Sequence, residues 1–314
     1  MKKKIGICFS KELQGETPLS HIIEKLPVYM RLLELMEAAN FEIYILTRKT
    51  YKANGVFEGG WHYESGKFTL VKKVLKIDLV YDRTGGIAFP LENDVLSVVN
   101  ERDFKVLAWD KWATYQLLGK YMPKTVLIDS LKDLPLVLPL IKSEMVVLKP
   151  YNGLKGFGIF IGKKEDAVNF EFNKKYSRYI AQEFVDTGNG IPGITPGMHD
   201  VRIVIVNGKP VWCHVRVPAE GKLLANAAQG GTLTEVDYGK VPESIKNVVN
   251  KVSKIFSSKY DNPVYSLDFG VGKNGRPYIF EINDQMGFPK WGMRNRDLFV
   301  NGLVDNFKEK LVNV

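Results

Sequence analysis

The sequence has few cysteines and no long apolar run. Its 314 residues include 2 cysteines, Cys8 and Cys213, and two thiols cannot build a disulfide framework or a cysteine zinc site. No apolar stretch approaches the roughly 18 residues of a membrane-spanning helix. The apolar segment that follows the N-terminal lysines ends at Phe9, which is too short for a secretory signal. These absences exclude a disulfide-rich scaffold and a membrane protein, and they predict a cytoplasmic location.

Positive charge is concentrated in the C-terminal two thirds of the sequence. Residues 1–110 carry 16 Lys and Arg against 15 Asp and Glu, whereas residues 111–314 carry 28 against 20. This excess indicates an anionic ligand, such as a nucleotide phosphate or an acidic peptide, or else a solvated basic surface. Because the sequence has no basic tail, zinc finger or RNA-binding signature, we expect no nucleic-acid partner.

Strand and helix patterns alternate in the first 108 residues, which predicts a small parallel sheet. The expected strands lie at 5–10, 42–46, 78–81 and 105–108, the helices at 28–40 and 91–100, and a hairpin at 55–67. The remaining residues predict antiparallel sheet with helices. Asn207-Gly208 favours a tight hairpin turn, and apolar residues spaced along one face predict a helix over 244–258. The predicted fold class is therefore α/β followed by α+β.

A glycine-rich segment from Asn152 to Gly158 joins two predicted strands. Its glycines, Gly153, Gly156 and Gly158, allow backbone amides to approach phosphate closely. No Gly-Lys-Ser/Thr follows and the next element is a strand, so the segment is neither a Walker loop nor a dinucleotide fingerprint. It is either a flap that closes over phosphates or a plain hairpin turn.

Three polar residues stand in the predicted C-terminal hairpin. Glu281 and Asn283 point to one face because strand residues two apart share a face, and Asp268 can face them from the other arm. Two carboxylates and an amide oxygen suit Mg²⁺. The alternative is the polar outer face of an exposed hairpin, but the apolar neighbours, such as Phe269 and Ile282, indicate that the hairpin is buried.

A third group combines acids and arginines. Asp200 and Arg202 alternate with apolar residues and so share one sheet face, and Arg216 follows on the next predicted strand. Guanidinium groups bind phosphates and carboxylates bidentately, which favours anion recognition. A structural Asp–Arg pair is the alternative.

In this order, the segments resemble the ATP-grasp superfamily, and most closely its branch of ribosomal-protein glutamate ligases and glutathione-synthetase-like enzymes. The resemblance covers about residues 109–290 and rests on Asp110-Lys111, Lys149-Pro150 with the glycine-rich segment, Gln182-Glu183-Phe184-Val185, Asp200-Val-Arg202, Arg216, Asn226 with Gly230-Gly231, Asp268 and Glu281-Ile-Asn283. It implies an ATP-grasp fold with an N-terminal parallel α/β substrate-side domain at 1–108. A central lid subdomain at 109–180 and a C-terminal subdomain with the metal site at 181–314 would follow.

The resemblance also implies a function. The protein would use ATP and Mg²⁺, or Mn²⁺ in its place, to join a small-molecule or peptide carboxylate to an amine through an acyl-phosphate. On the nucleotide side, it implies that Lys111, Lys149 and the three glycines bind the ATP phosphates, that Gln182, Glu183, Phe184 and Val185 bind the adenine, and that Asp200 and Asn226 line the pocket. It implies metal binding by Asp268, Glu281 and Asn283. The implied catalytic residues are Arg202, Arg216 and Lys149. A kinase acting on a small molecule and a non-catalytic ATP-binding protein are the alternatives. The oligomeric state is left open.

The sequence departs from the glutamate-ligase pattern at Leu224, in the long stretch 187–199 and in the segment 284–289. The last two lie near the expected acceptor site. Arg83 follows a predicted strand of the parallel sheet, where loops line ligand crevices. Together with Lys290, Arg294 and Arg296, it predicts a small anionic substrate, an amino acid or peptide carboxylate. Pairing of Arg83 with a nearby acid such as Asp82, and solvated charge at 290–296, are the alternatives.

Overall fold

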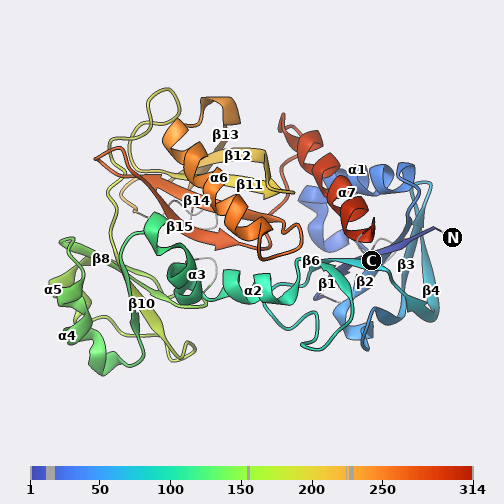
Figure 1. Cartoon of the computed structure of the whole chain (residues 1–314), viewed down its shortest axis with the longest axis horizontal. Helices are drawn as coiled ribbons and strands as arrows, with labels where there is room; N and C mark the ends of the chain where they lie inside the picture. The colour runs from blue at the N-terminus through green and yellow to red at the C-terminus, as the bar shows by residue number, and fades with distance from the viewer. Residues whose placement is uncertain (1, 12–17, 154–155, 224, 226–229, 313–314) are drawn as a thin grey trace.

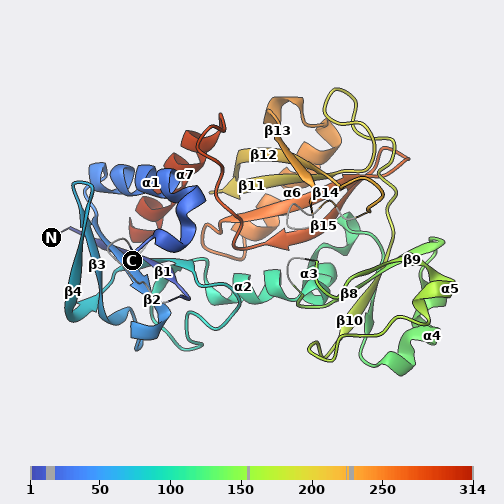
Figure 2. The same ribbon diagram turned by 180° about the vertical axis from the view of Figure 1, so that it is seen from behind.

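Three sheets are arranged along the longest axis of the molecule (Figure 1). The computed structural model describes residues 2–11, 18–153, 156–223, 225 and 230–312. The first sheet lies at one end of the molecule, the second lies at the other end, and the third lies between them, as the view from behind also shows (Figure 2). Short 3₁₀ helices occur at Ser20–Lys25, Arg48–Thr50, Gly119–Tyr121, Leu131–Asp133, Leu138–Leu140 and Tyr238–Lys240.

The first sheet has six strands in the order β4-β3-β2-β1-β5-β6. They are β1 (Lys4–Phe9), β2 (Glu42–Thr47), β3 (Val56–Glu64), β4 (Lys67–Lys76), β5 (Leu79–Arg83) and β6 (Ser97–Val99). The four strands β2, β1, β5 and β6 pair in parallel, and β3 and β4 add an antiparallel hairpin. The predicted parallel sheet with a hairpin is therefore confirmed. Helix α1 (Leu26–Ala38) buries Leu32, Leu33 and Met36 in the core on one face.

The second sheet is antiparallel, with the order β7-β10-β8-β9. It consists of β7 (Thr125–Ile128), β8 (Met145–Pro150), β9 (Phe160–Lys163) and β10 (Tyr179–Glu183), and it carries the short helices α4 (Leu134–Val137) and α5 (Lys164–Ala167). Its apolar cluster is separate from the other cores. The glycine-rich segment connects β8 to β9, as predicted.

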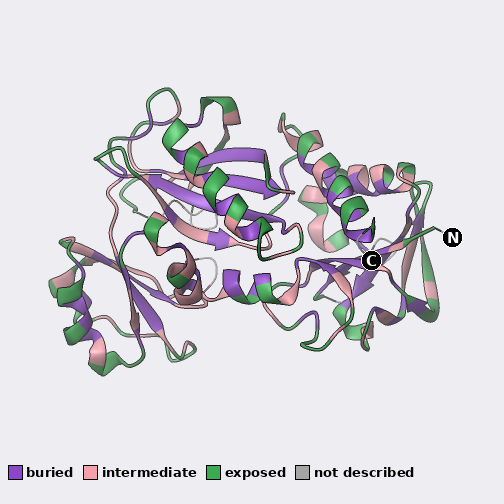
Figure 3. Cartoon of the chain, in the orientation of Figure 1, coloured by how far each residue is buried: buried purple, intermediate pink, exposed green. Residues whose placement is uncertain are grey.

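The third sheet is also antiparallel, with the order β13-β12-β11-β14-β15. It contains β11 (Asp200–Val206), β12 (Lys209–Val217), β13 (Thr232–Glu235), β14 (Tyr265–Val271) and β15 (Pro277–Asn283). Asn207 and Gly208 turn between β11 and β12 with φ values of 50° and 68°. Helix α6 (Glu243–Ser257) covers one face together with α2 (Arg102–Trp109) and α3 (Lys111–Leu118). Figure 3 shows that the strands are largely buried while the outer surface of α6 is exposed.

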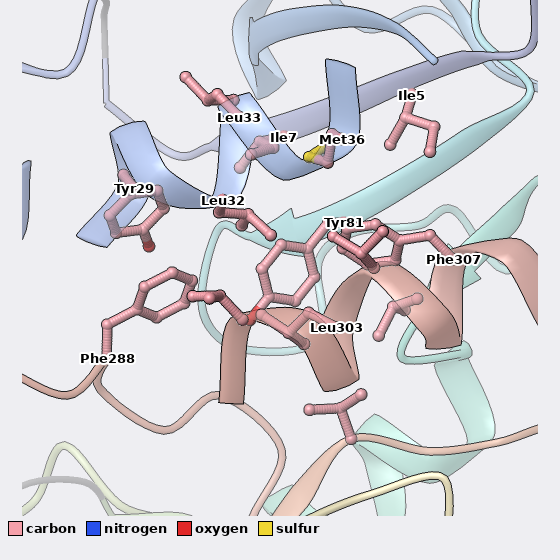
Figure 4. Close-up of a cluster of buried hydrophobic side chains, with 14 of the residues drawn as sticks. Ile5, Ile7, Tyr29, Leu32, Leu33, Met36, Tyr81, Phe288, Leu303 and Phe307 are labelled. Carbon is pink, nitrogen blue, oxygen red and sulfur yellow. The ribbon is translucent and has the colours of Figure 1, made fainter. Parts of the chain in front are cut away.

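The first and third sheets share one apolar core. Helix α7 (Arg296–Val312) packs against α1 and also contacts β11 and β12. Its residues Leu303 and Phe307 join Leu32 of α1 and Tyr81 of β5 in one cluster (Figure 4). The same cluster includes Trp212 of β12. These two sheets are thus joined by continuous packing, whereas the second sheet has its own core.

Two predicted elements are wrong. Residues 105–108 form part of α2 rather than a strand, because Phe104, Leu107 and Ala108 are buried at helical spacing. The expected helix at 91–100 is a loop that ends in β6, and the carboxylate of Asp94 holds the loop by accepting the N–H groups of Leu91 and Asn54. In the described parts of the chain, none of the helices has the length and apolar character required to cross a lipid bilayer.

Candidate active site

A cleft of about 440 Å³ separates the second sheet from the third. Nearly all of the sequence-predicted site residues line it: Lys111, Lys149, Gly153, Gly156, Gln182, Glu183, Phe184, Val185, Asp200, Arg202, Arg216, Asp268, Glu281 and Asn283. Gly158 does not line the cleft; it turns the chain at a φ of 73° close to Pro150 and Tyr179. Asn226 and Leu224 lie outside the described residues. Residues as far apart in the sequence as Lys111 and Asn283 therefore meet here.

An ion-pair cluster occupies the third-sheet wall of the cleft. Strand register sets Asp200 opposite Arg216, and Arg202 opposite Asp268, so all four side chains share one face. Arg202 donates from Nε to Asp268 Oδ1 and from Nη2 to Oδ2, both at 2.6 Å. Arg216 Nη2 donates to Asp200 and, at 2.8 Å, to Asp268 Oδ2. The Asp–Arg pairs that the sequence left as the alternative to anion recognition thus form, and they form on the cleft wall.

The two acids of this cluster have opposite pKa shifts. Burial acts to raise the pKa of Asp268, but the guanidinium groups of Arg202 and Arg216 outweigh it and hold the pKa below its usual value. Burial and the neighbouring charge of Asp268 raise the pKa of Asp200. Asp268 is therefore a permanent negative charge that fixes both arginines.

Two lysines line the cleft. Lys149 Nζ, on β8, donates to Gln182 Oε1 at 2.9 Å and to the Phe280 carbonyl at 3.2 Å. Lys111 Nζ, at the start of α3, donates to the Gly153 carbonyl at 2.7 Å and lies 3.0 Å from Glu281 Oε1. Burial lowers the pKa of Lys149 to about 8. The Lys111 ammonium is thus held beside the glycine-rich segment, and the Lys149 ammonium is held between β10 and β15.

The predicted metal ligands lie together on the β14–β15 hairpin. Asp268 and Glu281 are register partners, and Asn283 Nδ2 lies 3.3 Å from Asp268 Oδ2. No group of three or more His, Cys, Asp or Glu residues in the described chain is arranged to hold a metal by itself. Asp268 Oδ2 is already shared by three donors, whereas Glu281 forms one ion pair with a described residue, through Oε1 to Lys111. Because Mg²⁺ needs few protein ligands beside phosphates and water, this hard oxygen set fits it, with Glu281 as the more open ligand.

The other end of the cleft is apolar and includes residues that sequence reasoning missed. Phe184, Val185, Met198 and Phe280 line it, together with His199. His199 Nε2 accepts the N–H of Val271 at 3.2 Å, and its Nδ1 lies 3.0 Å from the Gly197 carbonyl, so the ring is a neutral tautomer with a proton on Nδ1. For Met198 and His199, the sequence signal was the unusual length of the stretch 187–199.

Two of the cationic residues expected near the acceptor, Arg83 and Arg296, are engaged elsewhere. Arg83 Nη2 donates to the Met286 carbonyl at 2.9 Å, and its guanidinium lies over the ring of Phe288. Arg296 pairs with Asp297 and stacks on Trp291. None of Arg83, Lys290, Arg294 and Arg296, all of which are described residues, lines the cleft. From the loop after β5, Gly85 and Gly86 reach the cleft instead, so the expected position of Arg83 is corrected.

Comparison with known proteins supports a relationship over the same segments. Residues 110–258 match the family model of the prokaryotic glutathione synthetase ATP-grasp domain. A glutathione synthetase from Yersinia pestis is 30% identical over 117 residues, which is 35% of each chain. The chain thus spans about a third of the length of the glutathione synthetases that it matches. A probable alpha-L-glutamate ligase from Alcanivorax borkumensis is 25% identical over 89% of this chain and 90% of its own.

Solved structures agree in fold at low sequence identity. D-alanyl-alanine synthetase A from Vibrio cholerae superimposes with a TM-score of 0.67 at 16% identity and covers all of both chains. A RimK domain ATP-grasp protein from Sphaerobacter thermophilus gives a TM-score of 0.61 at 15% identity, over 97% of this chain and 98% of its own. The similarity in fold extends over the N-terminal sheet as well as the segment that the family model covers.

Proposed function

Because the chain belongs to the ATP-grasp superfamily, we propose that it is an ATP- and Mg²⁺-dependent carboxylate–amine ligase that forms an amide bond through an acyl-phosphate. The observation that carries the proposal is the meeting of two lysines, two arginines and an acidic metal-ligand set in one cleft. Activation is required because a carboxylate is a poor electrophile. Phosphoryl transfer depends chiefly on positioning and charge neutralisation, which these residues supply.

The roles follow from the position of each residue. The apolar end, with Phe184 and Val185, holds the adenine, and Lys149 and Lys111 hold the phosphates under the glycine-rich segment. Glu281, Asn283 and Asp268 would hold Mg²⁺, which would supply positive charge to neutralise the phosphates. A substrate carboxylate oxygen attacks the γ-phosphorus while the bond to the departing ADP oxygen breaks. The amine then attacks the acyl carbon, inorganic phosphate leaves, and the amine loses a proton to solvent.

Arg216 has the geometry to stabilise the transferred group. Its Nη2 is used by Asp200 and Asp268, whereas its buried Nε has no hydrogen-bond partner in the described part of the chain. A buried N–H group without a partner is costly. An anionic oxygen of the phosphoryl group or acyl-phosphate would supply that partner, so the arginine can stabilise charge that appears during the reaction.

The Glu281→Gln variant tests the proposal. It removes one metal-binding charge without changing side-chain volume, so we expect ADP formation to fall by about a hundredfold or more. ADP release is measured with a panel of carboxylates, with and without amines. Glu243→Gln, on the exposed surface of α6, is the matched control.

The same assay separates the alternatives. Release of ADP that requires both a carboxylate and an amine supports a ligase. Release with a hydroxyl compound alone indicates a kinase, and ATP binding without turnover on any substrate indicates a non-catalytic protein. Near-native turnover by Glu281→Gln, with Mg²⁺ present and an unchanged unfolding midpoint, would show that the metal assignment is wrong.

A further inference from the structure

One end of the cleft is formed by the junction between the first and third sheets. We call it the acceptor end and define it by Gly85, Gly86, Trp109, Asp284 and Gln285, all of which line the cleft. Gly85 N donates to Gln285 Oε1 at 2.9 Å. A methyl group placed on Gly86 would lie 3.7 Å from the Trp109 ring. The turn of Gly85 and Gly86 therefore lies close to both the indole and the side chain of Gln285.

Protein partners already satisfy most polar groups around this end. Gln285 uses both ends of its amide, since its Nε2 donates to Asp82 Oδ2 at 3.1 Å. The charge of Asp82 is neutralised by Lys105, and both side chains are almost fully buried. Arg83 is held by the Met286 carbonyl and the ring of Phe288. The nearby cations are thus either paired or directed away from the cleft.

Asp284 differs from these groups. Its backbone carbonyl accepts a hydrogen bond from Asn100 Nδ2 at 3.0 Å, which fixes the position of the residue. Within the described residues, its carboxylate has no ion pair and accepts no hydrogen bond from another side chain. The acceptor end therefore presents a carboxylate without an ion pair together with an aromatic ring, and the five residues that define this end include no basic side chain.

We propose that the acceptor end binds the amine substrate as a primary ammonium, with the Asp284 carboxylate as its ion-pair partner and the Trp109 ring beside it. This inference rests on the proposed ligase function and names the recognition site of its second substrate. A carboxylate supplies a charge-assisted hydrogen bond to an ammonium, and an indole face attracts the same cation. The two features together favour a cation, whereas an anionic group at this position would meet an unpaired negative charge.

Calorimetry with simple probes tests this assignment. The chain is loaded with Mg²⁺ and ADP and titrated with L-amino acid amides, which carry an ammonium and no carboxylate, and separately with N-acetyl-L-amino acids, which carry only the carboxylate. We expect one or more amides to bind to the wild-type chain. Asp284→Asn should weaken that binding by about tenfold or more, through loss of the ion pair. Asp305→Asn, an exposed acid-to-amide change on α7, is the matched control and should leave it unchanged.

A second pair of variants examines the ring. Trp109→Leu should weaken amide binding severalfold, and Trp109→Phe should retain most of it, because the phenyl face still attracts a cation. The Mg²⁺ dependence of ADP binding should be the same in Asp284→Asn as in the wild-type chain.

Three results would overturn the assignment. They are the absence of binding by every amide, equal amide affinity of Asp284→Asn and the wild-type chain, and a shift in the Mg²⁺ dependence in Asp284→Asn, which would make the residue a metal ligand. Failure of the wild-type chain to bind Mg²⁺ and ADP would instead contradict the proposed function. In that case the amide titrations are carried out on the nucleotide-free chain and judged by the same criteria.

Discussion

The single carboxylate of Asp268 binds two guanidinium groups, those of Arg202 and Arg216. A substitution of Asp268 would therefore leave two largely buried positive charges without this partner. Asp268 is 2% exposed and accepts hydrogen bonds from Arg202, Arg216 and Asn283. Removing a partner from a buried ion pair leaves the remaining charge uncompensated, which costs more than the pair contributes. The cluster therefore fixes the positions of both arginines, whether or not its ion pairs add to the stability of the fold.

Lys149 offers a test of the phosphate site that depends on pH. Its ammonium is the form that attracts phosphate, and burial lowers its pKa to about 8. We therefore expect the affinity for ADP to decrease as the pH rises through about 8, because the free chain loses this charge there rather than above pH 10. Lys149→Met should weaken ADP binding by about tenfold or more and abolish this step.

The measurement is calorimetry between pH 6.5 and 9.5 with saturating Mg²⁺. Lys164→Met provides a control, since this lysine bonds to the Ile141 carbonyl and does not line the cleft. A pH step that persists in Lys149→Met would assign the titration to another group, and unchanged affinity would place the phosphates elsewhere.

At the scale of single residues, the sequence predicted the cleft wall well where strand alternation applies. Asp200 and Arg202 share a face because residues two apart on a strand do, and Asp268 and Glu281 join that face as register partners on the neighbouring strands. Arg83 could not be placed in this way. Its contact with the carbonyl of Met286 joins residues 203 positions apart in the sequence, and no local pattern encodes such a contact.

At the scale of the elements, the β14–β15 hairpin contributes both proposed metal-ligand acids, Asp268 and Glu281, and the apolar side chain of Phe280 to the cleft. Gly270 allows the close approach of the two arms, since a methyl group there would lie 2.2 Å from the Phe280 ring. Gly270→Ala should therefore displace Phe280, weaken ADP binding severalfold and lower the free energy of unfolding by about 1–3 kcal/mol.

Urea unfolding and ADP titration measure the two effects of Gly270→Ala. The matched control is Gly292→Ala, where an added methyl group meets no atom within 4 Å. Native ADP affinity and stability in Gly270→Ala would mean that Phe280 repacks without cost.

The type of an element was predicted correctly where its pattern of apolar residues was long. The prediction was wrong where the pattern was short. The 15 residues of α6 show a continuous apolar stripe. Helix α2 has 8 residues and includes Phe104, Val106, Leu107 and Ala108. If Val106 were buried, this short apolar run would fit a strand. Val106 is in fact 40% exposed, and the remaining apolar residues follow the helical period.

At the scale of the whole molecule, α7 determines how the first and third sheets are held together. Phe307 is fully buried and contacts the Tyr81 ring at a centroid distance of 5.5 Å. Phe307→Ala should lower the free energy of unfolding by about 3–5 kcal/mol because it leaves a cavity in the shared core. Leu298→Ala, on the same helix but 53% exposed, should change it by less than about 0.5 kcal/mol.

Urea denaturation monitored by circular dichroism measures both variants. If Phe307→Ala unfolds in two separate steps, the two sheets are less tightly coupled than their common core implies. Equal effects of the two substitutions would contradict the placement of α7.

This shared core could not be predicted from the sequence. An amphipathic helix indicates that one face is buried but not which sheet covers it, and α7 buries residues against both α1 and the third sheet. The domain boundaries expected at 108 and 180 remain predictions. The core that the first and third sheets share is continuous and marks no edge between them.

The participation of α7 in the core around α1 has a consequence for biosynthesis. The ribosome makes α1 and the strands of the first sheet early, yet the helix that covers Leu32 and Tyr81 is translated after every other described element. Until then, the nascent chain exposes part of an apolar surface that the finished protein buries. A stalled or truncated polypeptide ending before residue 296 would retain that surface, which would make it a target for chaperones and prone to aggregation.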